Sequence, residues 1–331
     1  MKKFFRIIIT IIIVAIAIFY IRHYSSIKLV PPENPPFFSV IYTYYFNPLF
    51  TFSFEEIKND IKNIKNAGFE GVKINFAFRQ DNFISEEIAQ IAAKNSLYPI
   101  GQLIGHREKP KERAFTNEEL SKWEEFVRSE VRKNKDIIYF WEIWNEPCMV
   151  DMQFRYGTPA EYLELLKRTQ KIIKEENPSA KIIVTADTGV REASAFTNEF
   201  LALGGGKYFD FLSFHPYTTD KDLGLEEMIF NKKMAEEQQL LVKYHINKPL
   251  WISEIGYPNS EFGEDGQAQR AETAFKTAYN NKIPIVWLHY SDRRLSTIDG
   301  KTGWGLVRED NTFKPAYEKI KAFISQAEAE N

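Results

Sequence analysis

Cysteine is almost absent from the sequence. The single thiol, Cys148, forms no internal disulfide, so no cystine framework can stabilise the fold. The five histidines stand at scattered positions and form no spacing that is typical of metal ligands. We therefore predict no metal centre and no cofactor, which leaves any catalysis to ordinary side chains.

Neither sign of charge predominates. The chain has 43 Lys and Arg against 45 Asp and Glu, which gives a net charge of −2. Nucleic-acid-binding domains usually carry a clustered basic surface, so this balance argues against a nucleic-acid partner. Aromatic residues are frequent, with 27 Phe, 16 Tyr and 6 Trp. Enough of them remain beyond a core to stack on sugar rings or on bases, so composition alone does not identify a ligand.

One long hydrophobic run stands near the N-terminus. Lys2, Lys3 and Arg6 precede residues 7–21, in which Thr10 is the one polar residue. A basic start followed by an apolar stretch is typical of a signal anchor or of a cleaved secretion signal. Bulky residues follow the run, where a cleavage site needs small ones, and this favours the uncleaved anchor. The basic flank should stay in the cytoplasm, which leaves the rest of the chain outside it.

We accordingly divide the chain into three parts. Residues 1–23 are predicted to be a transmembrane signal anchor, so the membrane is an expected partner. Residues 24–36 contain four prolines and are predicted to be an extended tether. The folded domain is expected over residues 37–328.

Short apolar runs alternate with amphipathic charged segments from residue 37 onward. Eight such pairs follow one another, from the run at 37–46 with the segment at 54–68 to the run at 283–290 with the segment at 314–326. Continuous apolar runs are typical of parallel strands that helices cover. The alternation would also suit a doubly wound sheet. The count of eight favours an α/β fold with a single (β/α)8 TIM barrel and no second domain after it.

Two glutamates stand at the ends of predicted strands. Chemistry in such a barrel occurs at the carboxyl ends of the strands. The fourth run ends in WNEP and the seventh in SEIGY, so Glu146 and Glu254 should emerge at the same rim. Cleavage of a glycosidic bond needs two carboxyl groups, one that protonates the leaving oxygen and one that attacks or activates water. One glutamate alone would usually be a solvated charge, whereas two in aromatic-rich motifs predict a glycosidase.

Three motifs resemble those of clan A glycoside hydrolases. FWEIWNEP (140–147) is similar to their fourth-strand motif, and WISEIGYPN (251–259) to their seventh-strand nucleophile motif. FLSFHPY (211–217) is similar to the sixth-strand motif of families 39 and 5. The resemblance extends from about residue 67 to residue 317 and is greatest to family 39, with family 5 second. It implies a retaining β-glycosidase that hydrolyses O-glycosidic bonds of a poly- or oligosaccharide.

The resemblance also implies roles for residues at the motif positions. Glu146 would be the acid/base and Glu254 the nucleophile of a double displacement. Asn145 would hydrogen-bond the sugar 2-hydroxyl. Tyr217 would donate a hydrogen bond to Glu254, and His215 would line the same rim.

The chain departs from the family pattern on the second strand. Lys73 stands where the family usually has an arginine that supports the nucleophile, so the charge remains but the bidentate fork is lost. Either Lys73 or Arg79, just beyond the strand, is expected to supply that support, and we place Lys73 among the substrate-binding residues. Cys148 follows the fourth-strand motif and is expected to be a bystander thiol beside the site.

A second departure concerns the sugar platform. On the last strand the chain has His289 where the family often has tryptophan, and we place His289 among the substrate-binding residues. Trp287 lies two residues earlier, on the same face by strand parity, and is the predicted platform. Trp304, in the loop after that strand, is the alternative.

Other functions could use the same motifs. A carbohydrate-binding pseudoenzyme would explain the departures at Lys73 and His289, but the presence of both glutamates argues against it. A transglycosylase would use the same pair with a sugar in place of water as acceptor. A structural ectodomain would leave the motifs without a role. We expect a carbohydrate substrate, an extracytoplasmic catalytic domain and a monomer.

Overall fold

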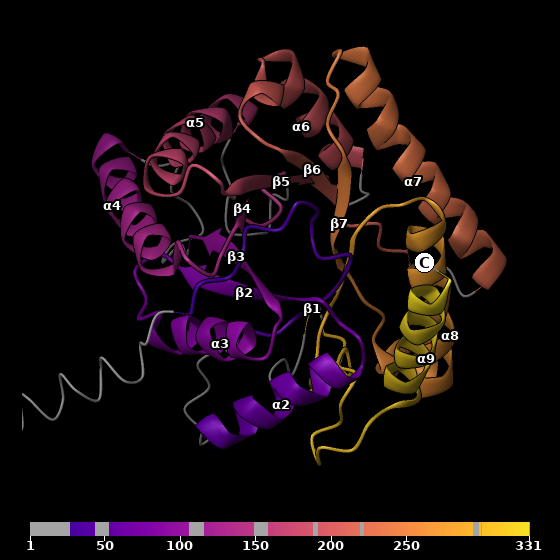
Figure 1. Cartoon of the computed structure of the whole chain (residues 1–331). Helices are drawn as coiled ribbons and strands as arrows, with labels where there is room; N and C mark the ends of the chain where they lie inside the picture. The colour runs from indigo at the N-terminus through magenta and orange to yellow at the C-terminus, as the bar shows by residue number, and fades with distance from the viewer. Residues whose placement is uncertain are drawn as a thin grey trace, which may run out of the picture.

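Eight parallel strands form a closed barrel in the described part of the chain, with helices around it (Figure 1). The computed structural model describes residues 27–43, 53–105, 116–148, 158–187, 191–218, 222–293, 298 and 300–330. The strands are β1 Phe38–Ile41, β2 Gly71–Ala77, β3 Tyr98–Ile104, β4 Phe140–Ile143, β5 Lys181–Asp187, β6 Phe211–Phe214, β7 Leu250–Ile255 and β8 Ile285–Trp287. The helices are α2 Phe54–Asn66, α3 Phe83–Lys94, α4 Asn117–Asn134, α5 Pro159–Glu176, α6 Arg191–Ala202, α7 Leu223–Lys243, α8 Asn259–Asn280 and α9 Pro315–Ala329, with a short 3-10 helix, η1, at Gly205–Lys207.

The order of the strands confirms the predicted (β/α)8 barrel. Each strand pairs in parallel with the next one along the chain, and β8 pairs with β1 to close the ring. Because the ring is closed, no strand edge remains open. A helix follows every strand and covers it. A doubly wound sheet, the alternative that the alternation left open, would have two edges.

Local sequence signals explain where α4 and α5 begin. The side chain of Thr116 accepts a hydrogen bond from the Glu119 amide, and Glu119 accepts one in return from the Thr116 amide, so α4 begins in a capping box. Thr158 and Glu161 form the same arrangement at the start of α5, where Pro159 occupies the first turn.

Two apolar layers hold the barrel together. The larger one lies between strands and helices and contains tryptophans such as Trp123, which contacts Trp144. The smaller one fills the barrel interior, where Phe140, Phe211 and Trp251 meet edge to face. Filling of the interior by side chains makes the barrel a packed core and leaves its ends as the sites for chemistry.

The two ends of the barrel are distinct. We call the end at which the strands finish the mouth, and the end at which they begin the base. The base consists of the loops that lead from each helix into the next strand, together with residues 27–36. Residues 27–36 of the predicted tether are packed on the base and are not a free spacer, and residues 24–26 lie outside the described residues. The folded part therefore begins earlier than the predicted boundary at residue 37.

The described residues contain no helix that is long and apolar enough to cross a membrane. The predicted signal anchor at residues 1–23 lies outside the described residues. Its role stays a prediction.

Candidate active site

Glu146 leaves the end of β4 through a strained turn at the mouth. Trp144 and Glu146 have backbone φ angles of 70° and 44°. This left-handed region costs a non-glycine residue on the order of 1–3 kcal/mol, and such residues cluster at functional sites. Glu146 is buried, with 4% of its surface exposed. The turn thus holds a carboxylate away from water at the position where the motif predicted the acid/base.

Glu254 stands next to last in β7 and is held by a tyrosine. The Tyr217 hydroxyl donates a 2.8 Å hydrogen bond to Glu254 Oε1, as predicted. The Glu254 side chain is 17% exposed, which leaves it open to a ligand. Burial raises the pKa of Glu254, and the Glu146 carboxylate adds to this, whereas His215 and Lys73 oppose it. Burial followed by the charge of Glu254 raises the pKa of Tyr217 well above its ordinary value, so Tyr217 stays a donor.

The His215 ring lies between the two glutamates. Its Nδ1 is 2.6 Å from Glu146 Oε1 and 4.0 Å from Glu254 Oε1. One oxygen of each glutamate and one ring nitrogen of His215 all lie within 4.8 Å of one another. Burial alone would lower the pKa of His215, but the charge of Glu254 and the hydrogen bond to Glu146 outweigh burial and raise it. The rim position predicted for His215 is therefore a direct contact with Glu146.

Beneath His215, buried polar side chains cross the barrel interior. His215 Nε2 is 3.0 Å from Ser253 Oγ, and Ser253 donates a 2.7 Å hydrogen bond to Glu142 Oε1. Lys73 Nζ lies 2.5 Å from the other carboxylate oxygen of Glu142, and both side chains are inaccessible to solvent. Buried charges are stable only when they are paired and hydrogen-bonded, as these are. We call Lys73, Glu142, Ser253 and His215 the interior relay.

The interior relay determines which nitrogen of His215 carries a proton. The carboxylate of Glu142, paired with Lys73, can only accept, so Ser253 donates its hydroxyl proton there. Ser253 Oγ therefore accepts from His215, whose Nε2 must carry hydrogen. His215 Nδ1 is left facing Glu146, and one proton is shared across that 2.6 Å contact.

Two neighbouring hydroxyls complete the interior relay. Thr185 donates to Glu142, and Ser213 donates a 2.6 Å hydrogen bond to Ser253. The Ser253 amide in turn donates to the Ser213 hydroxyl at 3.1 Å. Sequence reasoning missed Glu142, Ser253 and these two hydroxyls. The available signal was polar residues inside otherwise apolar strands, with Glu142 four residues before Glu146.

Lys73 does not contact Glu254, the residue that it was expected to support. Its ammonium donates to the Ser253 carbonyl at 3.0 Å and pairs with Glu142, so it supports Glu254 from below through charge and not by contact. Because its side chain is 1% exposed, the prediction that Lys73 binds substrate is wrong. Arg79 lies over the Phe78 ring and near the Glu119 carboxylate, which directs it away from the glutamate pair.

Asn145 is partly exposed at the rim and is oriented by a residue that the motifs did not reveal. The Gln102 side-chain amide, in β3, donates to Asn145 Oδ1 at 3.1 Å and to the Trp144 carbonyl at 3.3 Å. Because Asn145 Oδ1 accepts the hydrogen bond from Gln102, the N–H groups of the Asn145 side chain remain as donors for a ligand. This agrees with a residue that binds a sugar hydroxyl.

Trp287 and His289 are not at the mouth surface. Trp287 is completely buried between β8 and the helices, where it contacts Tyr257 and Phe275. The predicted platform is therefore wrong, because Trp287 lies on the helix-facing side of its strand. His289 is also completely buried, and its ring bonds to the Thr43 and Ser291 backbones, so it cannot contact substrate directly.

Trp304 lies beside Tyr217, the tyrosine that holds Glu254. Its ring meets the Tyr217 ring edge to face, with centroids 6.1 Å apart. Trp304 is 7% exposed, and its indole nitrogen donates to the Lys301 carbonyl. The alternative platform is thus adjacent to the tyrosine that holds Glu254.

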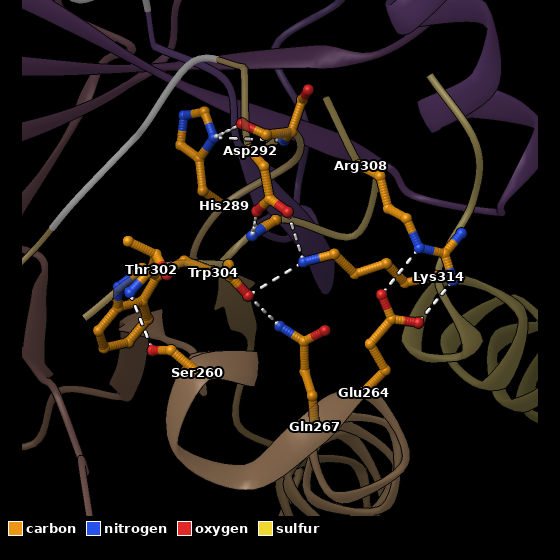
Figure 2. A network of polar contacts seen from close by, with 12 residues as sticks. Ser260, Glu264, Gln267, His289, Asp292, Thr302, Trp304, Arg308 and Lys314 are labelled. Atoms are coloured by element: carbon orange, nitrogen blue, oxygen red, sulfur yellow. Dashed lines mark hydrogen bonds and ion pairs between the residues drawn. The ribbon is translucent and has the colours of Figure 1, made fainter. Parts of the chain in front are cut away.

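A polar network fixes the loop that carries Trp304 (Figure 2). The fully buried ammonium of Lys314 lies 2.7 Å from the Asp292 carboxylate and donates to the Gly303 carbonyl at 3.0 Å. Asp292 also accepts a 2.6 Å hydrogen bond from the Gly305 amide. Gln267, on α8, donates to the same Gly303 carbonyl at 2.9 Å. The residues on both sides of Trp304 are therefore tied to α8 and α9.

Glu146, His215 and Glu254 are close enough to serve as ligands of one cation. Each of the three already has a protein hydrogen-bond partner, which accounts for their approach without an ion. Cys148 lies two residues from Glu146, is buried in the apolar layer and has no place in this arrangement.

Comparisons with known proteins agree with this geometry. Residues 116–260 match the family model described as Glycosyl hydrolases family 39. This stretch contains β4, β6 and β7, which carry Glu146, His215 and Glu254. None of the curated proteins matches the sequence.

Solved structures with the same fold include several glycoside hydrolases. A GH5_18 variant from Streptomyces cattleya in complex with Manβ1-4GlcNAc superposes with a TM-score of 0.68 at 13% identity, over 90% of this chain and 82% of that chain. Xylanase 10B from Thermotoga maritima gives a TM-score of 0.64 at 17% identity, over 89% and 97% of the two chains. β-Glucuronidase 2 from Bacteroides uniformis gives 0.64 at 17% identity, over 87% of this chain but 35% of that one.

At these identities the solved structures establish the fold, and the family match carries the assignment. The match covers the strands that bring the two glutamates together, so it confirms the resemblance seen in the motifs. The chain is a glycoside hydrolase whose residues 116–260 match the family 39 model.

Proposed function

We propose that the protein is a retaining β-glycosidase that hydrolyses O-glycosidic bonds of a poly- or oligosaccharide. The observation that carries the proposal is the separation of the two glutamates, which have carboxylate oxygens within 4.8 Å of each other. Retaining enzymes hold the pair ~5–5.5 Å apart, whereas inverting enzymes hold it ~6.5–9.5 Å apart to admit a water molecule. The observed separation leaves no room for that water and favours direct attack.

In the first step the glycosidic bond breaks and an ester forms. The Glu254 carboxylate attacks the anomeric carbon, and Glu146 gives a proton to the leaving oxygen. Tyr217 holds the attacking carboxylate in place through its hydroxyl. The leaving sugar departs with the proton, and the remaining sugar is bound covalently to Glu254.

In the second step water hydrolyses the ester and releases the sugar from Glu254. Glu146, now a carboxylate, takes a proton from water, and the resulting hydroxide attacks the same carbon from the side that the leaving group vacated. The ester breaks, Glu254 is released, and the configuration at the anomeric carbon is retained. His215 shares the Glu146 proton at 2.6 Å, so the interior relay keeps that proton at the place where both steps need it.

The first test separates the two glutamates. We expect Glu254→Gln to reduce turnover by a factor on the order of 10⁴ or more, because the nucleophile is lost while the shape is kept. Glu146→Ala should still form the glycosyl–enzyme on a substrate whose leaving group needs no protonation, and azide should restore its turnover as a β-glycosyl azide. Wild-type turnover in either variant would falsify the role of that residue.

The second test identifies substrate and acceptor. Purified protein should be assayed on a panel of polysaccharides and oligosaccharides that includes mannose-, xylose- and glucuronate-containing glycans, with products resolved by size. Hydrolysis yields a new reducing end for each bond that is cleaved. Products longer than the starting glycan would indicate transglycosylation instead, and binding without products would indicate a pseudoenzyme.

The cellular location is part of the proposal. The basic flank and apolar run of residues 2–21 support a membrane anchor with the catalytic domain outside the cytoplasm. We expect the full chain to remain with the membrane fraction and to be removed by protease treatment of intact cells. A soluble mature form in the medium that begins after the run would show that the segment is a cleaved signal.

A further inference from the structure

The chain reaches the barrel across its base. The Leu29 amide donates a 2.9 Å hydrogen bond to the Asp136 carbonyl, just before β4, and the Tyr139 hydroxyl donates to the Leu29 carbonyl at 2.9 Å. Further along, the Phe37 amide donates to the Glu70 carboxylate at 2.8 Å, just before β2. Residues 27–36 therefore cross from the start of β4 past the start of β2 to β1. Figure 1 shows this segment, in indigo, passing across the end of the barrel.

Close packing fixes the segment along this path. Pro36 is buried against Gly71, where even a methyl group would meet the proline ring at 2.9 Å. Ile27 and Leu29 pack against the two apolar layers. Ile27, at which the described chain begins, therefore lies at the base.

The base and the active site are at opposite ends. Glu146 and Glu254 stand at the ends at which β4 and β7 finish. Asp136 and Glu70 stand before the starts of β4 and β2. α5 has 18 residues and runs between the two ends, which at 1.5 Å per residue corresponds to about 27 Å. The mouth is separated from the base by the full height of the barrel.

The exposed surface of the base is rich in lysine and has projecting apolar side chains. Exposed lysines lie at this end in the last helical turns, in the loops that follow those turns and in the crossing segment. They include Lys28, Lys65, Lys94, Lys135, Lys207, Lys243 and Lys282. Exposed acidic residues at the same end are Glu33, Glu175, Glu199, Glu328 and Glu330, of which Glu175 is paired with Arg128. Val30 and Val242 are 77% and 74% exposed there, and Leu203 is 48% exposed.

We propose that the base of the barrel rests on the anionic phospholipid surface of the membrane, with the mouth facing away from it. The inference rests on the proposed anchor. If the apolar run ends at residue 21, five residues remain before Ile27, and these span at most ~18 Å. Such a short link keeps the base next to the headgroups. Each lysine near an anionic surface adds attraction, and Val30 can enter the interface.

The orientation defines the class of substrate. Glycan chains that come from outside reach the mouth directly. Sugars attached to lipids of the same membrane would have to extend past a barrel about 27 Å high to reach Glu254. The substrate that this arrangement fits is a polysaccharide of the cell envelope or matrix beyond the membrane surface.

Fluorescence quenching in vesicles tests the orientation. The full chain with Cys148→Ser is reconstituted into vesicles that contain phosphatidylglycerol and a headgroup-nitroxide lipid. A fluorophore is attached at Lys135→Cys, on the base, or at Glu309→Cys, an exposed residue in the mouth-side loop after β8. We expect quenching at position 135 to be at least twice that at position 309. Equal or greater quenching at position 309 would overturn the orientation.

The same preparation distinguishes a failed orientation from a failed anchor. Protein that stays with the vesicles while neither position is quenched retains the anchor but refutes the docked base. Protein that does not co-sediment with the vesicles refutes the anchor and the inference together.

A charge-reversal pair tests the lysines. The base variant Lys28→Glu/Lys135→Glu/Lys282→Glu, labelled at Lys207→Cys, should lose at least half of the quenching. The control variant, with the same label, changes the net charge equally at exposed lysines on the helix flanks: Lys171→Glu, Lys276→Glu and Lys321→Glu. It should keep the quenching of the parent protein. Equal losses in both variants would contradict a specific role for the base.

Discussion

At the residue scale, the proton of Glu146 depends on a serine that never meets the substrate. Ser253 connects His215 to the buried Glu142–Lys73 pair. In Ser253→Ala the Nε2–H of His215 loses its acceptor, and leaving a buried polar group unpaired costs about 1–3 kcal/mol. We expect kcat/KM to fall about 10- to 100-fold and the pH profile to shift. Substrates that need no protonation of the leaving group should be affected least in the glycosylation step.

A matched substitution separates this role from loss of packing. Ser39 is equally buried in β1, far from His215, and its hydroxyl contacts the Pro36 carbonyl only at 3.5 Å. Ser39→Ala should leave the pH profile unchanged. If Ser253→Ala keeps the wild-type profile as well, the interior relay does not control the proton.

Glu254, the proposed nucleophile, should lower the stability of the fold. Burial raises the folded pKa of Glu254 above its unfolded value. The contribution of this group to stability is therefore complete at pH values below the unfolded pKa, and it is lost as the pH rises through the folded pKa. Glu254→Gln has no charge to bury, so its melting temperature should exceed that of the wild type at pH 7.5 and approach it near pH 4. The exposed Glu309→Gln should show no such pH-dependent difference, and a constant offset for Glu254→Gln would contradict the assignment.

Sequence motifs predicted the two glutamates that we propose perform the chemistry and missed the residues that support them. Glu146 and Glu254 are recognisable because the residues around them form local motifs. Gln102, Glu142 and Ser253 act through side chains on neighbouring strands, and only barrel closure brings those strands together. No local spacing in the sequence contains this information.

At the element scale, the loop between β8 and α9 depends on one buried ion pair. Lys314→Met leaves the Asp292 carboxylate without its cation, and breaking a buried pair in this way costs about 3–5 kcal/mol. Because the Gly303 carbonyl loses one of its two donors and Asp292, which holds the Gly305 amide, loses its cation, Trp304 should be less well placed. KM for an oligosaccharide should then rise more than kcat falls. Urea unfolding and steady-state kinetics measure the two effects.

A double substitution is the internal control for the ion pair. Lys314→Met combined with Asp292→Leu removes both charges and should recover part of the lost stability, because neither partner remains unpaired. Additive losses would indicate that the two residues act independently.

Helix starts were predictable and one strand face was not. Capping boxes at Thr116 and Thr158 are local patterns, and both helices begin there. β8 has three residues in the barrel and is followed by an irregular loop, so parity counted along it gave Trp287 the wrong side. Trp304 reaches the site through a loop whose path is determined by Lys314 and α8, which periodicity does not describe.

At the scale of the whole molecule, the crossing segment should be part of the stable fold. A protein that begins at residue 37 lacks the Leu29 contacts and leaves the Tyr139 hydroxyl with only the 3.5 Å bond to the Asp136 carbonyl. We expect it to be less stable than a protein that begins at residue 27 by about 2–4 kcal/mol, from the lost hydrogen bonds and the lost apolar burial. Denaturant unfolding gives the comparison. The exposed Val30→Ser serves as the control and should change stability little; an equal stability of the two truncated proteins would show that the segment is a passive spacer.

Proline content predicted a tether here and gave no sign of its attachment to the barrel. Four prolines exclude a helix, and the sequence therefore read as a free tether. The attachment uses backbone groups of Leu29 and the fit of Pro36 against Gly71, neither of which has a sequence signature. Barrel topology, by contrast, followed from the count of alternating segments alone.

The division of labour around the ring has an evolutionary consequence. The residues of the proposed reaction all come from the arc of the barrel that runs from β4 to β7. Trp304 belongs to the loop after β8, outside that arc. Recombination or insertion in the remaining mouth loops can therefore alter which glycan is accepted while the bond-cleaving arc is inherited intact. A library that diversifies only the loops after β1, β3 and β8 should yield new specificities with folded, active members, and one that diversifies the arc should not.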